Sequence, residues 1–145
     1  VHVFSREEFV AMAGIGESAG KIDPRESRII RNLFRLSSLT VSDIMTPRTV
    51  ISSLPQDITV TEALDAEPAV THSRLPLYEK DLDHVTGFIL RDDLLHSKAL
   101  DDGDFKLQTL RRDIITVSDT MPLSDLLEFL LDQRQQIALV IDEYG

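Results

Sequence analysis

Cysteine is absent from this chain of 145 residues, and glycine and proline number six each. Without cysteine the sequence offers no disulfide, no thiolate metal ligand and no cysteine nucleophile. No apolar run approaches the roughly 18 residues that a membrane-spanning helix needs. No basic start followed by an apolar stretch resembles a signal peptide. The length and the 42% of hydrophobic residues predict one globular domain with a real core.

Basic residues are the minority, with 15 Lys and Arg against 25 Asp and Glu, so the net charge is −10. A chain this acidic repels phosphate backbones, which argues against general nucleic-acid binding. The acidic side chains are interpreted either as a solvated surface or as an attraction for divalent cations.

Motifs of catalysis are also missing from the sequence. There is no G-x-S-x-G nucleophile elbow and no G-x-x-x-x-G-K-[ST] phosphate loop. His72 stands beside Ser73, and adjacent residues of a strand point to opposite faces. The histidines show no zinc-ligand spacing; they are His2, His72, His84 and His96. The sequence therefore predicts no catalytic residue, no metal site and no enzyme.

Helix starts are clearly marked in the first half of the chain. Ser5 and Thr59 each stand three residues before a glutamate, as in a capping box, and Asp23 precedes Pro24. We expect one helix from Ser5 that stops near residues 14–16, a second after Asp23 and a third after Thr59 that ends at Pro68. Thr40 opens a short turn that Pro47 ends.

Strand patterns follow in two series. Expected strands cover residues 49–51, 75–78 (interrupted by Pro76), 85–90, 114–117 and 137–141, and expected helices start at residue 92 and at Pro122. The run 137–141 is continuously apolar, which predicts a strand buried on both faces.

The order of elements repeats along the chain. Shifted by 63 residues, 59–64 falls on 122–127 and 75–79 falls on 138–142, with polar and apolar character largely conserved between the two copies. This predicts an α+β fold of two packed β-α-β-β-α units. Expected boundaries are a helical connector at 1–40, a first unit at 41–103 and a second unit at 104–145. Because the second unit lacks its last strand and helix, we expect the protein to continue beyond Gly145 or a partner chain to cover the open sheet edge.

Four segments carry a family resemblance. They are VSDIMTPR (residues 41–48), HSRLPLY (72–78), GFILRDDL (87–94) and VIDEYG (140–145). Their order is similar to that in the paired cystathionine-β-synthase (CBS) units of the CNNM/CorC (hemolysin-like) magnesium and cobalt transport family. The capped helices before Met45 resemble the connector that follows the transmembrane part in membrane-embedded members.

The resemblance implies a regulatory role. Paired CBS units form a flat disc that dimerises, here expected as a homodimer through the CBS helices, which include the leucine stripe of residues 123–131. Clefts between units bind adenine nucleotides, so ATP or AMP, with or without Mg²⁺, is the implied ligand. The implied partner is the membrane part of the same longer chain, on the cytoplasmic side of the inner membrane.

The resemblance and the needs of a nucleotide together suggest site residues. A nucleotide requires an apolar slot, phosphate donors and a ribose acceptor. The candidates are Val50, Ile51 and Pro76 for the slot, Arg48 and Arg74 for phosphates, and Asp93 for ribose. Leu90 replaces the Thr or Ser common in CBS units at that position.

Other interpretations of these residues stay open. Arg74 is equally a surface salt-bridge partner, Arg48 a cap of the preceding turn, and Asp93 a favourable charge at a helix N-terminus. As a whole, the chain is also compatible with a ligand-free dimerisation scaffold whose acidic surface responds to divalent ions. A third alternative is a CBS insert that regulates a metabolic enzyme.

Overall fold

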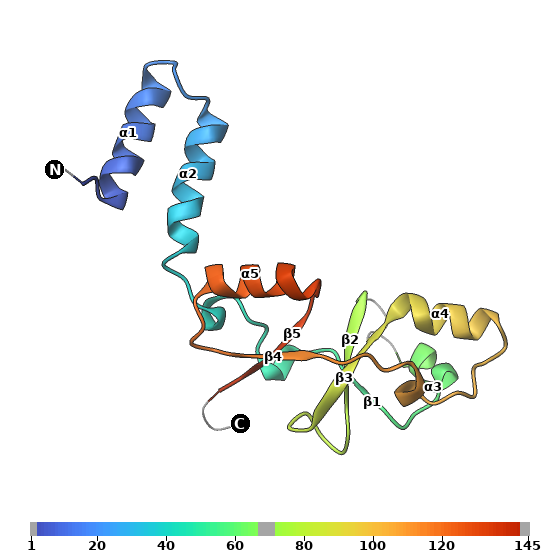
Figure 1. The fold of residues 1–145 in the computed structure, drawn as a ribbon. Coiled ribbons are helices and arrows are strands. Elements are labelled where there is room, and N and C mark those ends of the chain that lie inside the picture. Colours follow the sequence, from blue (N-terminus) through green and yellow to red (C-terminus); the bar gives the residue numbers. More distant parts are fainter. Residues whose placement is uncertain (1–2, 67–71, 143–145) are drawn as a thin grey trace.

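The computed structural model describes residues 3–66 and 72–142, which form helices and strands in mixed order (Figure 1). The first part contains α1 (Arg6–Ser18), α2 (Pro24–Leu36), the 3-10 helices η1 (Val41–Asp43) and η2 (Arg48–Val50), β1 (Leu54–Pro55), α3 (Val60–Asp65), β2 (Arg74–Tyr78), β3 (Val85–Leu90) and α4 (Arg91–Ala99). The second part contains η4 (Leu107–Leu110), β4 (Ile115–Ser118), α5 (Leu123–Gln133) and β5 (Ala138–Ile141). The predicted α+β class is confirmed.

The helix starts lie where the caps predicted them. The Ser5 hydroxyl accepts the Glu8 N–H at 3.2 Å, and the Asp23 carboxylate accepts the Arg25 N–H at 2.8 Å. Glu26 completes the capping box of α2, since its Oε1 accepts the Asp23 N–H at 3.1 Å. These bonds satisfy N–H groups that have no partner inside the helix. Helix α3 ends at Asp65, before the predicted stop at Pro68. Pro68 itself and the last three residues of the VIDEYG segment lie outside the described residues.

The predicted end of α1 near residues 14–16 is wrong. Glycine inside a helix costs only about 1 kcal/mol relative to alanine, and the turn at Gly14 and Gly16 stays helical. The helix ends instead at Ser18, followed by the C-cap residue Ala19 and by Gly20, whose φ is +74°. That left-handed residue ends the helix because glycine adopts it without steric cost.

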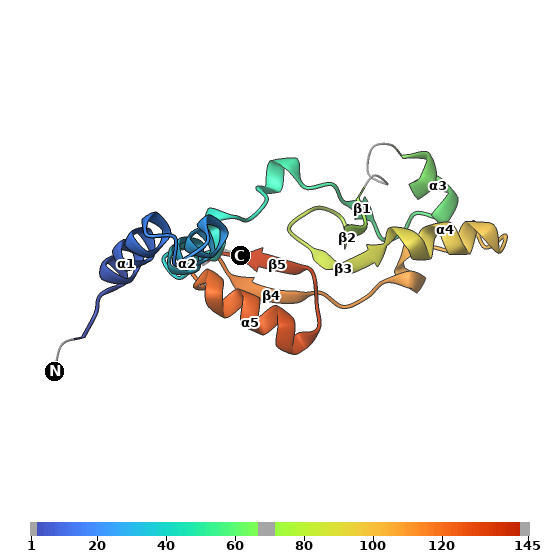
Figure 2. The ribbon, with the colours of Figure 1, turned by 90° about the horizontal axis from the view of Figure 1, so that it is seen from above.

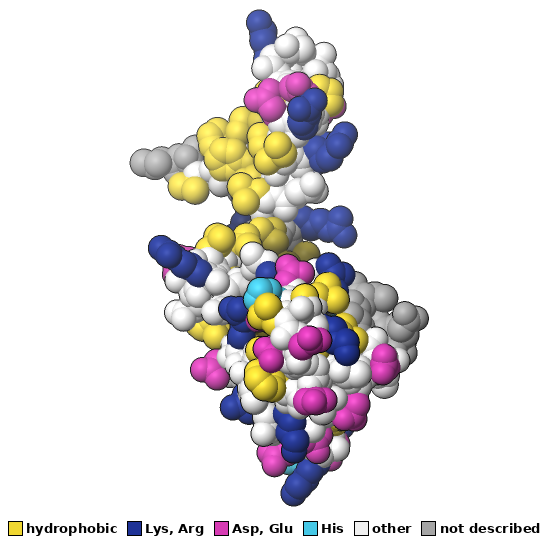
Figure 3. Space-filling model, turned by 90° about the vertical axis from the view of Figure 1, so that its right-hand side faces the viewer, with side chains coloured by type: hydrophobic (Ala, Val, Ile, Leu, Met, Phe, Trp, Pro, Cys, Tyr) yellow, Lys and Arg dark blue, Asp and Glu magenta, His cyan; other side chains and the backbone are white. Residues whose placement is uncertain are grey.

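Helices α1 and α2 form a hairpin that stands apart from the two sheets (Figure 1). Apolar side chains gather on one face of this hairpin (Figure 3). A groove of about 350 Å³ runs there, lined by Phe9, Met12, Ala13, Ile22, Ile30, Leu33 and Phe34. None of the helices in the described part of the chain is long and apolar enough to cross a membrane.

Each unit is built around a parallel β-α-β element. Strands β1 and β2 pair in parallel around α3, and β4 and β5 pair in parallel around α5. The helices start at Val60 and at Leu123, and 123 − 60 = 63, the predicted shift. In a second view the two units lie side by side, with α5 beside the helical hairpin and α3 and α4 at the far end (Figure 2).

Strand β2 runs through Pro76 without the predicted interruption. Its neighbour β1 pairs with Leu77 and Tyr78, so within the described parts of the chain no strand lies beside Pro76 on that side. On the other side Pro76 faces Phe88, whose own N–H and C=O bond to Arg112 instead. The missing N–H of proline therefore leaves no hydrogen bond of the sheet unmade.

Two strand predictions are wrong. Residues 49–51 do not form a strand, because the Val50 N–H bonds back to the Pro47 carbonyl at 3.0 Å and closes the turn η2. The strand of the first unit begins later, at Leu54. In the second unit β5 is not buried on both faces, since Ala138, Leu139 and Val140 are only partly buried and Ile141 is 41% exposed.

The two hydrophobic cores exchange segments. Val41, which precedes the first unit's sheet, is 1% exposed in the core of the second unit with Val117, Leu123 and Leu126. Leu107, which precedes the second unit's sheet, is fully buried in the core of the first. Backbone bonds hold both crossings, from the Val41 N–H to Met121 O and from the Leu107 N–H to Ile58 O, each at 2.9 Å.

The segment between the units then packs closely on β3. Arg112 and Phe88 exchange two backbone hydrogen bonds of 2.8 and 2.9 Å. A Cβ at Gly87 would lie 2.3 Å from the Arg112 carbonyl oxygen and 2.7 Å from Cγ of Arg111. Glycine at position 87 therefore allows the linker to approach the sheet.

Replacing this glycine tests the close approach. We expect Gly87→Ala to destabilise the chain by about 1–3 kcal/mol, because the new methyl group meets backbone rather than a flexible side chain. Gly14→Ala is the matched control, since a Cβ at Gly14 meets nothing within 4 Å and alanine favours the helix. Urea unfolding followed by circular dichroism measures both, and equal midpoints for Gly87→Ala and the unmodified chain would contradict the packing.

Candidate functional site

A hollow of about 320 Å³ lies where the two units and their linker meet. Its lining comes from three parts of the chain: Arg74, Phe88 and Leu90 from β2 and β3, Arg112 and Asp113 from the linker, and Arg134, Gln135 and Gln136 from the end of α5. The volume is at the lower end of the range of about 300–1,000 Å³ usual for ligand pockets.

The β2–β3 pair presents one face to the core and the other to the hollow. Leu75 and Leu77 of β2 and Ile89 of β3 are fully buried in the first unit's core. The alternate residues point the other way, where Arg74 pairs with Leu90 and Pro76 pairs with Phe88. The predicted residues Arg74 and Pro76 thus share the face that borders the hollow, and Arg74 is among its lining residues.

Asp93, the predicted ribose acceptor, lies in the first turn of α4, where a negative charge is favourable. Its side chain is 32% exposed, and its Oδ2 accepts hydrogen bonds from Arg112 Nη2 at 3.1 Å and Nε at 3.3 Å. Asp93 does not itself line the hollow, but its ion-pair partner does.

Arg134 reaches the same place from the second unit. It caps the C-terminus of α5 in the left-handed conformation, with φ 53° and ψ 41°. Its N–H bonds to the Leu131 carbonyl at 3.2 Å. This turn ends the helix and directs residues 134–136 toward the linker side of β3, where they line the hollow.

The hollow concentrates positive charge in an acidic protein. Three arginines line it against one aspartate, Asp113, although the whole chain carries −10. Among the described residues, neither Arg74 nor Arg134 has an ion-pair partner. Guanidinium groups bind phosphate and carboxylate oxygens in pairs, so this arrangement can hold an anion.

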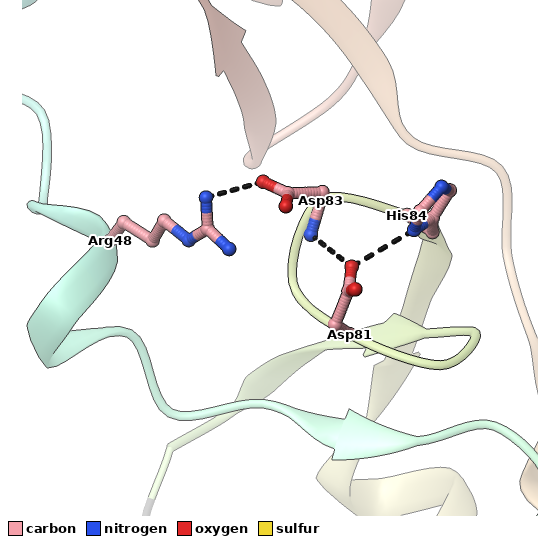
Figure 4. Close-up of polar contacts among 4 residues, drawn as sticks. All are labelled: Arg48, Asp81, Asp83 and His84. Carbon is pink, nitrogen blue, oxygen red and sulfur yellow. Dashed lines mark hydrogen bonds and ion pairs between the residues drawn. The ribbon is translucent and has the colours of Figure 1, made fainter.

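Arg48 lies away from this group. Its guanidinium pairs with Asp83 in the turn between β2 and β3 (Figure 4). Arg74 stands at the opposite end of β2, and four residues of strand separate it by roughly 13 Å from Tyr78, after which the turn with Asp83 begins. The structure therefore does not bring Arg48 together with Arg74.

The turn between β2 and β3, which contains the Arg48 partner Asp83, has further polar contacts (Figure 4). Asp81 bonds to the His84 ring through Nδ1 at 2.9 Å and accepts the Asp83 N–H at 2.9 Å. These two contacts, the His84 bond first, lower the pKa of the Asp81 carboxyl from its ordinary value. No group of three or more His, Cys, Asp or Glu side chains in the described parts of the chain could hold a metal ion.

Val50 and Ile51, the other predicted slot residues, do not line the hollow. Val50 is 64% exposed at the end of η2, and Ile51 is partly buried beside it. The apolar lining comes instead from Phe88 and Leu90.

Sequence reasoning missed two arginines of the hollow. Arg112 belongs to the only adjacent arginine pair in the sequence, a signal that was available. Arg134 carries no such signal, because its position depends on where α5 ends.

Comparison with known proteins agrees with this architecture. A family model described as "CBS domain" matches residues 104–145. The magnesium and cobalt efflux protein CorC of Escherichia coli is 28% identical over 97% of this chain. The chain spans 48% of CorC, less than half of that relative's length.

Solved structures are similar over most of the chain. The CBS domain of a bacterial CNNM/CorC family Mg²⁺ transporter superposes with a TM-score of 0.88 at 27% identity, over 99% of this chain and 87% of that one. Such a domain in complex with ATP gives a TM-score of 0.78 at 27% identity, over 84% and 87% of the two chains.

A hemolysin-like protein containing a CBS domain, from Oenococcus oeni, is 32% identical, with a TM-score of 0.73. The match covers 80% of this chain and 85% of that one. Together with the paired β-α-β elements and their exchanged core segments, these likenesses show that the chain belongs to the CBS-domain modules of the CNNM/CorC (hemolysin-like) family.

Proposed function

We propose that this chain is the regulatory, adenine-nucleotide-binding module of a protein that transports divalent cations such as magnesium or cobalt. The observation that carries the proposal is the hollow between the units, where three guanidinium groups converge in a chain of net charge −10. Phosphate groups are the ligands that such a cluster recognises. The ATP complex of a similar domain supports the same ligand class.

The surroundings of the hollow supply the other parts of a nucleotide site. Phe88 and Leu90 offer apolar surface for the base, with Pro76 next to Phe88 on the same face. Arg74 binds phosphate, and the carboxylate of Asp93 accepts hydrogen bonds from the ribose hydroxyls. Mg²⁺ enters with the nucleotide, held by phosphate oxygens and water, because Mg²⁺ keeps several waters at such sites. Nothing in this arrangement positions a nucleophile, so we propose that the nucleotide is sensed and not hydrolysed.

The helical hairpin is proposed to join the module to the membrane part of a longer chain, on the cytoplasmic side of the inner membrane. Its groove exposes large apolar side chains, with Phe9 45%, Met12 42% and Leu33 61% exposed. Apolar surface of this kind marks an interaction site. The relative CorC, of which this chain spans less than half, supports such an attachment.

We propose that two copies of the chain form a homodimer through helix α5. Leu127 and Leu131, one helical turn apart, are 48% and 69% exposed, while Leu123 and Leu126 face the core. Two leucines at this spacing form a stripe on one side of the helix. A second copy of the chain would remove them from water.

Nucleotide binding is tested by thermal unfolding with AMP, ADP and ATP, each with and without Mg²⁺. A nucleotide at 100 times its dissociation constant should stabilise the chain by about 2.7 kcal/mol, or roughly 5–10 °C. Arg74→Gln should reduce the shift. If no nucleotide shifts the transition while Mg²⁺ alone does, the alternative of a ligand-free scaffold with a divalent-responsive surface replaces this proposal.

Arg48→Gln is the comparison variant for this experiment. Its guanidinium already pairs with Asp83 at the other end of the β2–β3 hairpin. We expect Arg48→Gln to keep most of the nucleotide-induced shift. A loss as large as that of Arg74→Gln would move the site to the η2 end of the sheet, beside Val50 and Ile51.

The dimer is tested by sedimentation velocity. Leu131→Asp places a charge in the proposed contact and should shift the chain toward the monomer, because burying an unpaired charge is costly. Ile15→Asp on α1 is the matched control, since Ile15 is also 69% exposed. An unmodified chain that sediments as a monomer at every concentration, or a Leu131→Asp chain that remains dimeric, contradicts this contact.

A further inference from the structure

Arg112 is the residue at which the hollow, helix α4 and the linker meet. Its backbone is fixed by the two hydrogen bonds to Phe88. Its side chain is 53% exposed, lines the hollow and pairs with Asp93. A fixed backbone with a long, exposed side chain allows the guanidinium to change partners while the sheet stays intact.

The pair with Asp93 is of a kind that exchanges readily. Both side chains remain partly exposed, at 53% and 32%, and ion pairs in contact with water contribute little. While the ion pair is formed, the carboxylate of Asp93 binds the guanidinium of Arg112. Each is then less available to a ligand in the hollow.

We infer that Arg112 is a phosphate-binding residue that Asp93 holds in the absence of ligand, and that ligand binding exchanges this pair. The Arg112 guanidinium then binds phosphate oxygens, as do those of Arg74 and Arg134 around the hollow. The carboxylate of Asp93 is released from Arg112 and accepts hydrogen bonds from the hydroxyl groups of the ribose. This inference rests on the proposed nucleotide site and assigns two of its residues to a shared equilibrium.

The exchange predicts effects of opposite sign for two partial ligands. Inorganic tripolyphosphate has phosphates and no ribose, whereas adenosine has a ribose and no phosphates. Asp93→Asn removes the competitor for Arg112, so tripolyphosphate should bind about two- to five-fold more tightly and adenosine more weakly. Arg112→Gln removes the partner of Asp93, so adenosine should bind more tightly and tripolyphosphate more weakly.

Isothermal titration of the 145-residue chain with both probes and with ATP measures these signs. Arg111→Gln is the matched control, since it removes the same charge from the adjacent residue, whose guanidinium donates to Gln56 and does not line the hollow. Arg111→Gln should weaken the binding of tripolyphosphate only slightly and leave the affinity for adenosine unchanged. A residue that merely supports the fold would weaken both probes together.

A second measurement needs no variant. In the unmodified chain, the ¹⁵N–¹H signal of the Arg112 side-chain Nε should move on addition of tripolyphosphate, while that of Arg111 stays in place. This readout remains valid even where a substitution at Asp93 or Arg112 lowers stability.

The outcomes separate this inference from the proposed function. Opposite signs in the two variants, with a moving Arg112 signal, support the exchange. If ATP binds but Asp93→Asn fails to tighten tripolyphosphate, the exchange is overturned and the nucleotide site stands. If the unmodified chain binds neither ATP nor either probe, both the site and the exchange fall.

Discussion

The two units depend on a crossing of chain segments, because neither core closes with residues of its own sheet and helices alone. Val41 fills the core around α5, and Leu107 fills the core around α3. Hydrophobic burial of this kind is the main favourable term in folding. Each unit is therefore stabilised by a segment that enters from the other side of the molecule, and the two act as one structure.

The candidate site is a product of that crossing. After Leu107 has entered the first core, the chain must return to the second unit along β3, and it does so in contact with Gly87 and Phe88. This path sets Arg112 beside Asp93 and opposite the end of α5. The charged residues of the hollow thus come from both units and the linker. The affinity of a ligand in the hollow would therefore depend on how the two units are placed relative to each other.

The sequence predicted the elements whose cause is local. The caps at Ser5 and Asp23 depend on side chains within three residues, and the 63-residue shift depends only on polar and apolar order. Predictions failed where one local signal competes with another, or where burial depends on distant contacts. The Val50 N–H bonds to the Pro47 carbonyl and closes a turn in place of a strand, and Ile141 at the end of β5 is 41% exposed.

The site was predicted in part, for a similar reason. Arg74 was found because its segment resembles a family motif, and the structure places it on the hollow. Arg134 could not be found, since its place follows from the left-handed residue that ends α5. Whether the six residues suggested by the sequence bind a nucleotide stays a prediction. The structure places Arg48, Val50 and Ile51 in and beside η2, and Arg74 at the opposite end of β2 from the turn that contains Asp83, the partner of Arg48.

The crossing also bears on the order in which the chain can fold during synthesis. Val41 leaves the ribosome long before Leu126, its neighbour in the finished core, and 126 − 41 = 85 residues separate them. At about 5–20 residues per second, Val41 waits roughly 4–17 s for that partner. The first unit, in contrast, is complete once Leu107 has emerged. Vectorial folding therefore favours the first unit, and Val41 stays without its core partners until the second unit has been synthesised.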